Sequence, residues 1–282
     1  MIRLCAFADE ASSILDGQIA ALKRNGIYSL ELRSVDGKNV KDISVTEAKE
    51  YRERLDRAGI SVFSIGSPIG KSDIDEEIDK VVAEARHIFT LANIFGAKKI
   101  RMFSFFKAYE KPDEVISRLR LLIEIAKEYG LTLCHENEKE IYGDTPERVS
   151  LLLDEVKGLS SVYDPANYVQ VGASGDEFFP LSERAEYFHI KDVIKETGEL
   201  VPAGYGDGRL QELIASLPED AVISIEPHLA VFDGYASIDN SEMKHKFNYN
   251  SNDEAFDAAV SAVRDIFKRL GYTERDGGFI KL

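Results

Sequence analysis

Short apolar runs alternate with longer amphipathic segments along most of the chain. In the longer segments apolar residues recur at helical spacing, as Ile74, Ile78, Val81 and Ala85 do. The short runs have the length and composition of buried strands. They are IRLCAF (2–7), SLELR (29–33), ISVFSIG (60–66), KKIRMFSF (98–105), LTLCHENE (131–138), SSVYDPA (160–166), EYFHIKD (186–192) and AVISIEP (221–227). The pattern predicts repeated units of a strand followed by a helix.

Proline and glycine mark the ends of the predicted helices. These helices are expected over 46–58 (with Thr46 as N-cap), 73–96, 112–129, 145–157 and 253–270. Roughly eight strand-then-helix units fit the chain length, which favours the α/β class and one (β/α)₈ TIM barrel as a single domain over residues 1–282. An open doubly wound sheet is the alternative. Its nucleotide-binding versions lack support, because no G-x-G-x-x-G follows the first strand and no Walker motif appears.

Polar residues stand at the carboxyl ends of several predicted strands. Because successive strand residues face opposite sides, Ile223 and Ile225 share one face while Glu226 belongs to the other. The same alternation places polar residues of three further strands on the face away from the large apolar side chains. The four residues are Glu136, Asp164, His189 and Glu226. In a TIM barrel the inner face ends at the rim that carries the active site, so we expect the four side chains to converge.

Three converging carboxylates would repel one another strongly unless one of them held a proton or a cation lay between them. Three carboxylates and an imidazole suit Mn²⁺, Mg²⁺ or Co²⁺, and Zn²⁺ is also compatible. Each residue taken alone is more often a salt-bridged or solvated group at a strand end, and this alternative stays open. The set of four leads to the hypothesis of one divalent metal ion, with Mn²⁺ as the first expectation.

The composition narrows the range of functions. Apolar residues make up 44% of the chain, enough for a sizeable core, whereas the formal net charge is −15 and the pI is about 4.9. An acidic surface repels nucleic-acid phosphates and anionic membranes, so neither partner is expected. Cys5 and Cys134 lie far apart in apolar runs, which indicates buried residues rather than a disulfide framework or a zinc site.

Two further segments bear on location and access. The N-terminal apolar run is too short for a signal peptide and no stretch approaches a membrane span, so we expect a soluble, cytoplasmic protein. The connection from His228 to about Asn252 is long and contains Gly, Asn, Ser and aromatic residues. A binding loop, a plain surface excursion and a subunit contact are all compatible with it, and a homo-oligomer is left open.

Several short motifs resemble the sugar isomerases and epimerases of the xylose-isomerase-like TIM-barrel superfamily, which includes ketose 3-epimerases, hydroxypyruvate isomerases and inosose dehydratases. The motifs are FADEASS (7–13), LELRSVDGKNV (30–40), GSPIGK (66–71), CHENE (134–138), VYDPANYVQVG (162–172), FHIKD (188–192), PAGYGDG (202–208) and SIEPHL (224–229). They cover nearly the whole chain and are fairly specific in this order. They do not specify a substrate.

The resemblance implies a metal ion bound by Glu136, Asp164, His189 and Glu226, the same four residues that the strand pattern selects. It also implies that Glu136 and Glu226 exchange the substrate proton in members that isomerise or epimerise. A metal ion bridging the carbonyl and hydroxyl oxygens of a sugar stabilises the enediolate formed when the proton leaves. One carboxylate removes the proton and the second returns it, to the other face or to the neighbouring carbon. Alternatively the two glutamates only ligate the metal, which would suit a hydrolase or a dehydratase.

Two expected substrate contacts depart from the family pattern. Asn167 stands where ketose epimerases commonly have a histidine, and Lys195 stands where they often have an arginine. Asn167 can still bind a hydroxyl group and Lys195 can still supply a cation. Lys191 and His228 are further candidates for substrate contact. The alternatives are an ion pair with Asp192 for Lys191 and, for His228, support of a metal ligand or a satisfied buried histidine.

Glu31 and Arg33, at the end of the second predicted strand, either pair with each other or orient substrate. The predicted function is a metal-dependent isomerase or epimerase of a small sugar or sugar phosphate. The alternative is a dehydratase of a cyclitol or keto-inositol on the same metal site. A hydrolase similar to endonuclease IV ranks lower, because the chain has five histidines and a negative charge. A non-catalytic sugar-binding barrel also ranks lower.

Overall fold

The computed structural model describes residues 1–232, 243–275 and 277–281. Within these residues eight parallel strands form a closed barrel, because the last of them pairs with both its predecessor and the first. The strands are β1 (Ile2–Ala6), β2 (Ser29–Leu32), β5 (Ser61–Gly66), β6 (Lys99–Met102), β7 (Thr132–Glu136), β8 (Ser160–Tyr163), β9 (Tyr187–Ile190) and β12 (Val222–Ile225). The predicted TIM barrel is confirmed, and the open doubly wound alternative is wrong.

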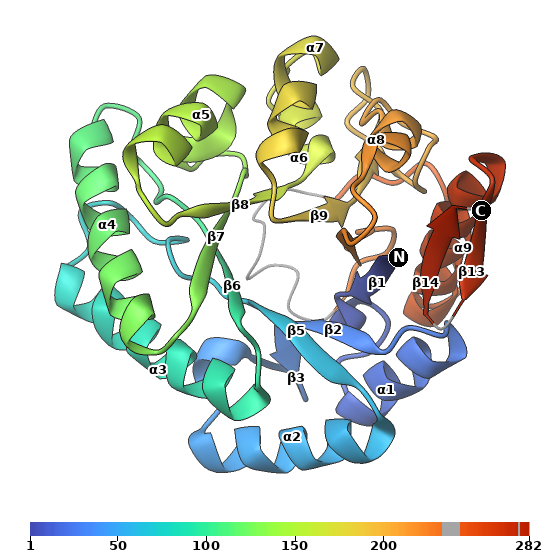
Figure 1. The fold of residues 1–282 in the computed structure, drawn as a ribbon, viewed down its shortest axis with the longest axis horizontal. Helices are drawn as coiled ribbons and strands as arrows, with labels where there is room; N and C mark the ends of the chain where they lie inside the picture. Colours follow the sequence, from blue (N-terminus) through green and yellow to red (C-terminus); the bar gives the residue numbers. More distant parts are fainter. Residues whose placement is uncertain (233–242, 276, 282) are drawn as a thin grey trace.

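Helices surround the barrel and cover the outer face of its strands (Figure 1). They are α1 (Leu15–Arg24), α2 (Val45–Ala58), α3 (Ile78–Phe95), α4 (Pro112–Glu128), α5 (Pro146–Glu155), α6 (Pro165–Gln170), α7 (Gly175–Phe178), α8 (Leu210–Ser216) and α9 (Asn252–Arg269). Two expected helix starts differ from the structure. Ser44 caps α2 in a capping box, so Thr46 is not the N-cap. Helix α3 begins at Ile78 rather than 73, because Asp73 forms an isolated bridge with Phe106 and the Ile74 amide, in the turn that follows, donates to the Phe106 carbonyl at 3.0 Å.

The alternation of strand side chains separates two apolar regions. On the outer face, residues such as Leu133 and Ile223 are at most 1% exposed and pack under the helices. Inside the barrel a smaller apolar cluster lies on the amino-terminal side of the polar strand ends. It consists of Cys5, Cys134, Val162, Tyr187 and Val222, with Phe63 packed against it. Both cysteines are free and fully buried, which confirms the prediction that they are buried residues.

The pairing of β2 with β5 contains one irregularity. The register shifts immediately before Glu31, which lies opposite Ser64, and the shift leaves Phe63 as an extra residue in β5. A bulge of this kind changes which side chains face inward. Phe63 contacts the ring of Tyr187 edge-on at 5.2 Å, and the Ser64 hydroxyl lies 3.1 Å from the Tyr187 hydroxyl. Two consecutive residues of β5 therefore face the barrel interior.

A hairpin near the C-terminus extends the sheet beyond the barrel. Strand β14 (Gly278–Lys281) pairs antiparallel with β1, and β13 (Tyr272–Arg275) pairs antiparallel with β14. No hairpin was predicted here, although the Asp-Gly pair at 276–277 of the sequence is a typical hairpin signal. The two chain ends consequently lie on the same side of the barrel (Figure 1).

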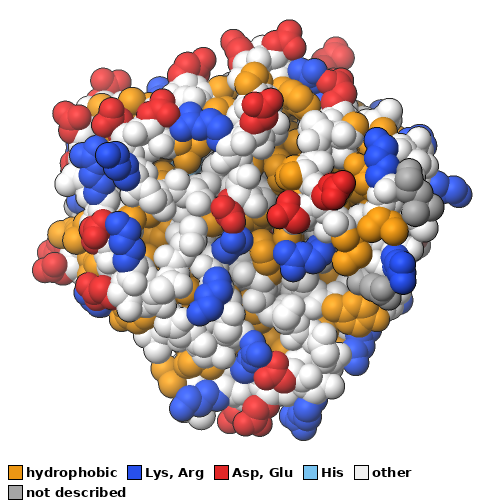
Figure 2. All heavy atoms as spheres, viewed as in Figure 1, with side chains coloured by type: hydrophobic (Ala, Val, Ile, Leu, Met, Phe, Trp, Pro, Cys, Tyr) orange, Lys and Arg blue, Asp and Glu red, His pale blue; other side chains and the backbone are white. Residues whose placement is uncertain are grey.

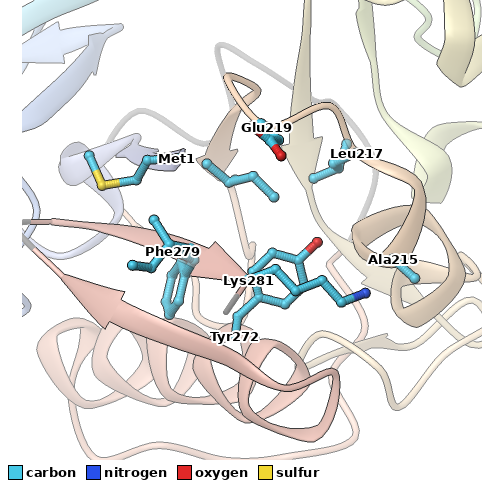
Figure 3. A pocket seen from close by; sticks show the side chains of 9 residues that line it. Met1, Ala215, Leu217, Glu219, Tyr272, Phe279 and Lys281 are labelled. Atoms are coloured by element: carbon cyan, nitrogen blue, oxygen red, sulfur yellow. The ribbon is translucent and has the colours of Figure 1, made fainter.

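A cavity of about 320 Å³ lies between the start of β1, α8 and this hairpin, at the amino end of the barrel (Figure 3). Its lining combines Met1, Leu217 and Phe279 with the charged residues Glu219 and Lys281. On the face shown in Figure 2, basic and acidic side chains are interspersed, so the net negative charge is not gathered there into one patch. None of the helices in the described part of the chain is long and apolar enough to cross a membrane.

The long connection after β12 contacts the loops that follow β9. Strands β10 (Asp192–Val193) and β11 (Leu200–Val201) form a short hairpin, and the Leu200 amide donates to the Lys244 carbonyl at 2.8 Å. The ring of Tyr205 meets that of Phe247 edge-on at 5.9 Å. The predicted loop at 228–252 thus packs on the β9 loop through residues 243–250, whereas residues 233–242 lie outside the described part.

Candidate metal centre

The four residues predicted to bind a metal lie at the carboxyl ends of four strands. Glu136 ends β7, Asp164 directly follows β8, His189 lies in β9 and Glu226 directly follows β12. One potential ligand atom of each lies within 4.8 Å of those of the others. All four side chains are buried, with exposed fractions of 2% or less. The structure thus brings the four residues into one cluster, while metal ligation itself stays a prediction.

His189 lies at the centre of this cluster. Its Nδ1 is 2.9 Å from Glu136 Oε1 and 3.0 Å from Glu226 Oε2, whereas its Nε2 faces Glu31 Oε2 at 3.1 Å. The ring of Phe7 packs edge-on against the imidazole with 5.2 Å between centroids. The two ring nitrogens therefore have different roles: Nδ1 faces the predicted metal ligands, and Nε2 faces a carboxylate outside that set.

Three buried cations contact the carboxylates of the cluster. Arg101 Nη1 lies 3.2 Å from Glu136 Oε2, Lys191 Nζ lies 3.0 Å from Asp164 Oδ2, and Arg33 Nη1 lies 2.6 Å from Glu226 Oε1. Buried carboxylates nevertheless outnumber these cations. The carboxylates are Asp9, Glu10, Glu31, Glu136, Asp164 and Glu226. An excess of buried negative charge is costly, so this site favours one more positive charge.

Arg33 connects the cluster to the loop after β1. Its Nε and Nη2 donate to the two oxygens of Asp9 at 2.9 and 3.0 Å, in bidentate geometry. Its Cζ lies 4.3 Å from the centre of the Phe7 ring. Asp9 and Glu10 belong to a short 3-10 helix, Ala8–Glu10, so the first turn after β1 is held against the inner rim.

The protonation of the cluster follows from these contacts. Burial alone would lower the pKa of His189, but the carboxylates of Glu136, Glu31 and Glu226 hold it well above its usual value. Burial acts to raise the pKa of Glu136, yet the charges of His189 and Arg101 lower it to about 2. Burial raises the pKa of Asp164 to about 6, and the ammonium of Lys191 limits that rise. A positive charge between the carboxylates therefore stabilises the cluster, and an imidazolium can supply part of it.

The donor set fits a divalent cation. Asp164 Oδ2 and Glu226 Oε2 are buried and receive no hydrogen bond from the described residues, although each has one cation at 3.0 Å. Buried carboxylate oxygens ordinarily accept hydrogen bonds or bind a cation. Oxygen-rich sets with one imidazole suit Mn²⁺, Mg²⁺, Co²⁺ or Zn²⁺. The residues present are thus compatible with a metal ion in contact with all four side chains.

A second group of possible ligands lies beside the first. Glu10, Glu226 and His228 also place potential ligand atoms within 4.8 Å of one another. Arg33 contacts both glutamates of this group, at 2.6 Å to Glu226 and 3.2 Å to Glu10. A guanidinium already supplies the positive charge at this position, so we assign the predicted metal to the first group.

Three of the four predicted substrate contacts lie next to the cluster. The Asn167 amide nitrogen is 3.5 Å from Glu136 Oε1, Lys191 contacts Asp164, and His228 Nε2 is 3.6 Å from Glu226 Oε1. Lys195 differs, because its exposed side chain donates to the carbonyl groups of residues 172 and 173. Substrate binding by all four residues stays a prediction.

The sequence did not indicate the contacts that several charged residues make in this site. Glu31 and Arg33 have separate partners rather than each other, and Arg101 contacts the cluster from β6. Arg101 carried a usable signal, since it occupies the same alternate face of its strand as Lys99 and Phe103. Asp9 and Glu10 belong to the FADEASS motif, but a single 3-10 turn has no periodic pattern from which their contacts could be inferred.

The closed barrel and the buried polar cluster at its carboxyl rim define the TIM-barrel class, in which active sites lie at this rim. Within this class the chain belongs to the xylose isomerase-like TIM barrel family, whose model matches residues 19–265. The resemblance expected from the motifs is confirmed at the level of the family.

Solved structures of similar fold include proteins with different reactions. The chain is similar to the IolI protein solved with a bound zinc atom, at 14% identity and a TM-score of 0.73 over 95% of this chain and 99% of that chain. It is similar to an L-ribulose 3-epimerase (16% identity, TM-score 0.70, covering 95% and 97%) and to the probable 3-DHS dehydratase AsbF from Bacillus anthracis (18%, 0.68, 94% and 99%). At these identities the likeness shows the fold alone. No curated protein matches the sequence.

Proposed function

We propose that the protein is a divalent-metal-dependent isomerase or epimerase of a small sugar or sugar phosphate. The observation that carries the proposal is the pair of buried glutamates, Glu136 and Glu226, which approach the same nitrogen of His189 at 2.9 and 3.0 Å. Two carboxylates at one point supply a group that accepts a proton and a group that returns one. The family match and the 3-epimerase among similar structures support sugar chemistry.

The metal would be held by Glu136, Asp164, His189 and Glu226. When bound, a divalent ion polarises the substrate carbonyl and stabilises the negative charge that develops as the neighbouring carbon loses its proton. Mn²⁺ is the first expectation for this oxygen-rich set, with Mg²⁺, Co²⁺ and Zn²⁺ as alternatives. The zinc in the IolI structure supports a divalent ion in this fold.

The two glutamates are the proposed proton-transfer groups. Each has its own guanidinium partner: Arg101 for Glu136 at 3.2 Å and Arg33 for Glu226 at 2.6 Å. These contacts fix the orientation of each carboxylate and favour its ionised form, which is the form that accepts a proton. The chain therefore provides two oriented bases whose separation is small enough to act on one carbon or on two adjacent carbons.

Three polar side chains beside the cluster are the proposed contacts for substrate hydroxyl groups. Asn167 Oδ1 is buried and receives no hydrogen bond from any described residue, so it offers an acceptor beside Glu136. Lys191 and His228 border the cluster on the sides of Asp164 and Glu226. Lys195 would first have to release two main-chain carbonyl groups in order to contact a substrate.

Solvent deuterium exchange tests this proposal. Candidate ketoses are incubated with Mn²⁺ and the protein in D₂O, and proton NMR follows deuterium at the carbons next to the carbonyl. We expect exchange with the wild type and a loss of about 10²–10⁴-fold in Glu136→Gln and Glu226→Gln, the usual contribution of a general base. Glu186→Gln, in the residue before β9 and paired with Lys99, is the matched control that keeps the wild-type rate. A normal rate in either active-site variant would contradict the assignment.

Product analysis separates the isomerase from the dehydratase. The fold similarity to a probable 3-DHS dehydratase keeps the cyclitol or keto-inositol dehydratase as the second candidate. A dehydratase loses water and creates an enone with new ultraviolet absorbance, whereas an isomer or epimer has none. Ultraviolet spectra recorded during turnover of ketoses and keto-inositols would therefore decide between the two reactions.

A further inference from the structure

Glu31 is a buried carboxylate that the proposed reaction does not use. Its exposed fraction is 0%, and it lies inside the barrel rather than among the residues predicted to bind the metal. Its Oε2 is 3.1 Å from His189 Nε2, and its Oε1 accepts a hydrogen bond from the Tyr187 hydroxyl at 2.6 Å. Among the described residues, His189 is its cationic partner. A buried carboxylate needs such partners, so its position depends on these two contacts.

The contact with Nε2 decides how His189 can act as a ligand. An imidazole that binds a metal through one nitrogen needs a lone pair there and carries its proton on the other nitrogen. A carboxylate acceptor beside Nε2 stabilises a proton at Nε2, which leaves the Nδ1 lone pair directed at Glu136 and Glu226. Ligating histidines in proteins commonly use this arrangement, and it also fixes the plane of the ring.

Surrounding residues hold Glu31 and His189 in this arrangement. The Tyr187 hydroxyl that donates to Glu31 also lies 3.1 Å from the Ser64 hydroxyl. Ser64 faces the interior because of the irregular register of β5, where it lies opposite Glu31. The rings of Phe7 and Tyr187 contact the imidazole edge-on, at 5.2 and 5.6 Å between centroids. The bulge therefore places the Ser64 hydroxyl beside the Tyr187 hydroxyl that donates to Glu31.

We infer that Glu31 is a positioning residue for the metal centre: with Tyr187 and Ser64 it holds His189 in the form that presents Nδ1 to the ion. This role rests on the proposed metal-dependent function. It adds a determinant of metal affinity from β2, a strand that contributes none of the four predicted ligands. Glu31 would influence catalysis only through the imidazole, without touching substrate.

Calorimetric titration of the metal-free chain with Mn²⁺ tests the inference in the absence of substrate. We expect Glu31→Gln to weaken Mn²⁺ binding by about 10–100-fold, the usual effect of removing a carboxylate behind a ligating histidine. Tyr187→Phe keeps the ring and should cause a smaller but measurable loss. In both variants the visible spectrum of bound Co²⁺ should change, since the ligand geometry is less well fixed.

Asp144→Asn provides a matched control. Asp144 is also a buried carboxylate that accepts a tyrosine hydroxyl at 2.6 Å, from Tyr109, but it lies outside the cluster. This variant should keep the wild-type affinity and Co²⁺ spectrum. Wild-type affinity in a folded Glu31→Gln, or in Tyr187→Phe if the first variant does not fold, would overturn the positioning role alone. A wild-type chain that binds neither Mn²⁺ nor Co²⁺ would overturn the metal-dependent function together with it.

Discussion

His135 and His189 lie on the two faces of the same barrel wall, and both are fully buried. His189 faces inward, and the carboxylates around it hold its pKa well above the usual value despite burial. His135 lies on the outer face of β7, where its Nε2 contacts the Ser104 hydroxyl at 2.9 Å, and burial lowers its pKa to about 4. Equal burial thus gives opposite protonation, because only the inner face gathers carboxylates near the imidazole.

The comparison also separates two uses of a buried polar residue. On the outer face, His135 and Ser104 complete local packing, since a side chain at Gly143 would collide with the His135 ring. On the inner face, charged groups from strands distant in sequence converge at one point. Substitutions on the inner face should therefore change chemistry more than stability, and those on the outer face should do the reverse.

Loss of the inner histidine should have the largest effect. His189→Asn removes the imidazole from the proposed metal centre, so we expect turnover to fall by orders of magnitude and added Mn²⁺ to stop raising the melting temperature. His135→Asn should retain both turnover and the Mn²⁺ response, and a chelator should abolish turnover in the wild type. Ketose turnover and thermal unfolding with and without Mn²⁺ provide the measurements. Equal turnover in the two variants would remove the distinction between the faces.

We expect His135, on the outer face, to control the loss of folding stability in acid. Its folded-state pKa of about 4 lies below the usual 6.5, so the unfolded chain binds the proton more readily between these values. Burial of the neutral His135 imidazole therefore costs no stability above pH 6.5. As the pH falls toward 4, protonation of the unfolded chain lowers the free energy of unfolding by about 3 kcal/mol. Urea unfolding at several pH values should show a shallower acid decline in His135→Asn than in the wild type.

His87→Asn serves as the control for this acid effect. His87 is only partly buried and contacts the Ile43 carbonyl at 2.9 Å, away from both faces of the wall. Its replacement should leave the difference between pH 6.5 and pH 4 close to that of the wild type. Parallel stability curves for the wild type and His135→Asn would show that burial of this imidazole does not control the acid response.

The smallest expected effect is the reaction of the two cysteines with a thiol reagent. Burial raises the pKa of Cys5 to about 12 and raises that of Cys134 as well, and both lie in the apolar cluster inside the barrel. We expect no reaction with a thiol reagent at pH 8 in the folded protein and two reactive thiols after unfolding in guanidinium. Labelling of the folded chain would show that reagent and water reach the apolar cluster around Cys5 and Cys134 inside the barrel.

The fold could be predicted because its signal is local and repeated. Each barrel strand is a short apolar run, and alternation within it separates Ile225 from Glu226. The helix starts were less predictable, because contacts far along the chain decide them. The bridge between Asp73 and Phe106 is one such contact. The C-terminal hairpin was not predicted, although its turn residues are visible in the sequence. Its partner in the sheet is β1, at the other end of the chain, and no local pattern indicates this pairing.

The cluster was predictable only in part for a related reason. The alternation of side chains predicts that Glu136 and His189 face the barrel interior. It does not predict which side chains of other strands they contact there. The partner of Glu31 is 158 residues away in His189, and a bulge in β5 shifts the register beside it. A bulge has no reliable sequence signal here, so the sequence suggested Arg33 as a partner where the structure has Tyr187 and His189.

The closure of the barrel through β1 and β12 has a consequence for the order of events during synthesis. Strand β1 must wait for Val222–Ile225 before this edge is paired, so the nascent chain carries an unpaired strand edge until residue 225 has left the ribosome. Glu226 emerges with that same final strand. The proposed metal site can be completed only once the barrel closes. Metal binding would therefore stabilise the folded barrel after it has formed and would not nucleate its folding.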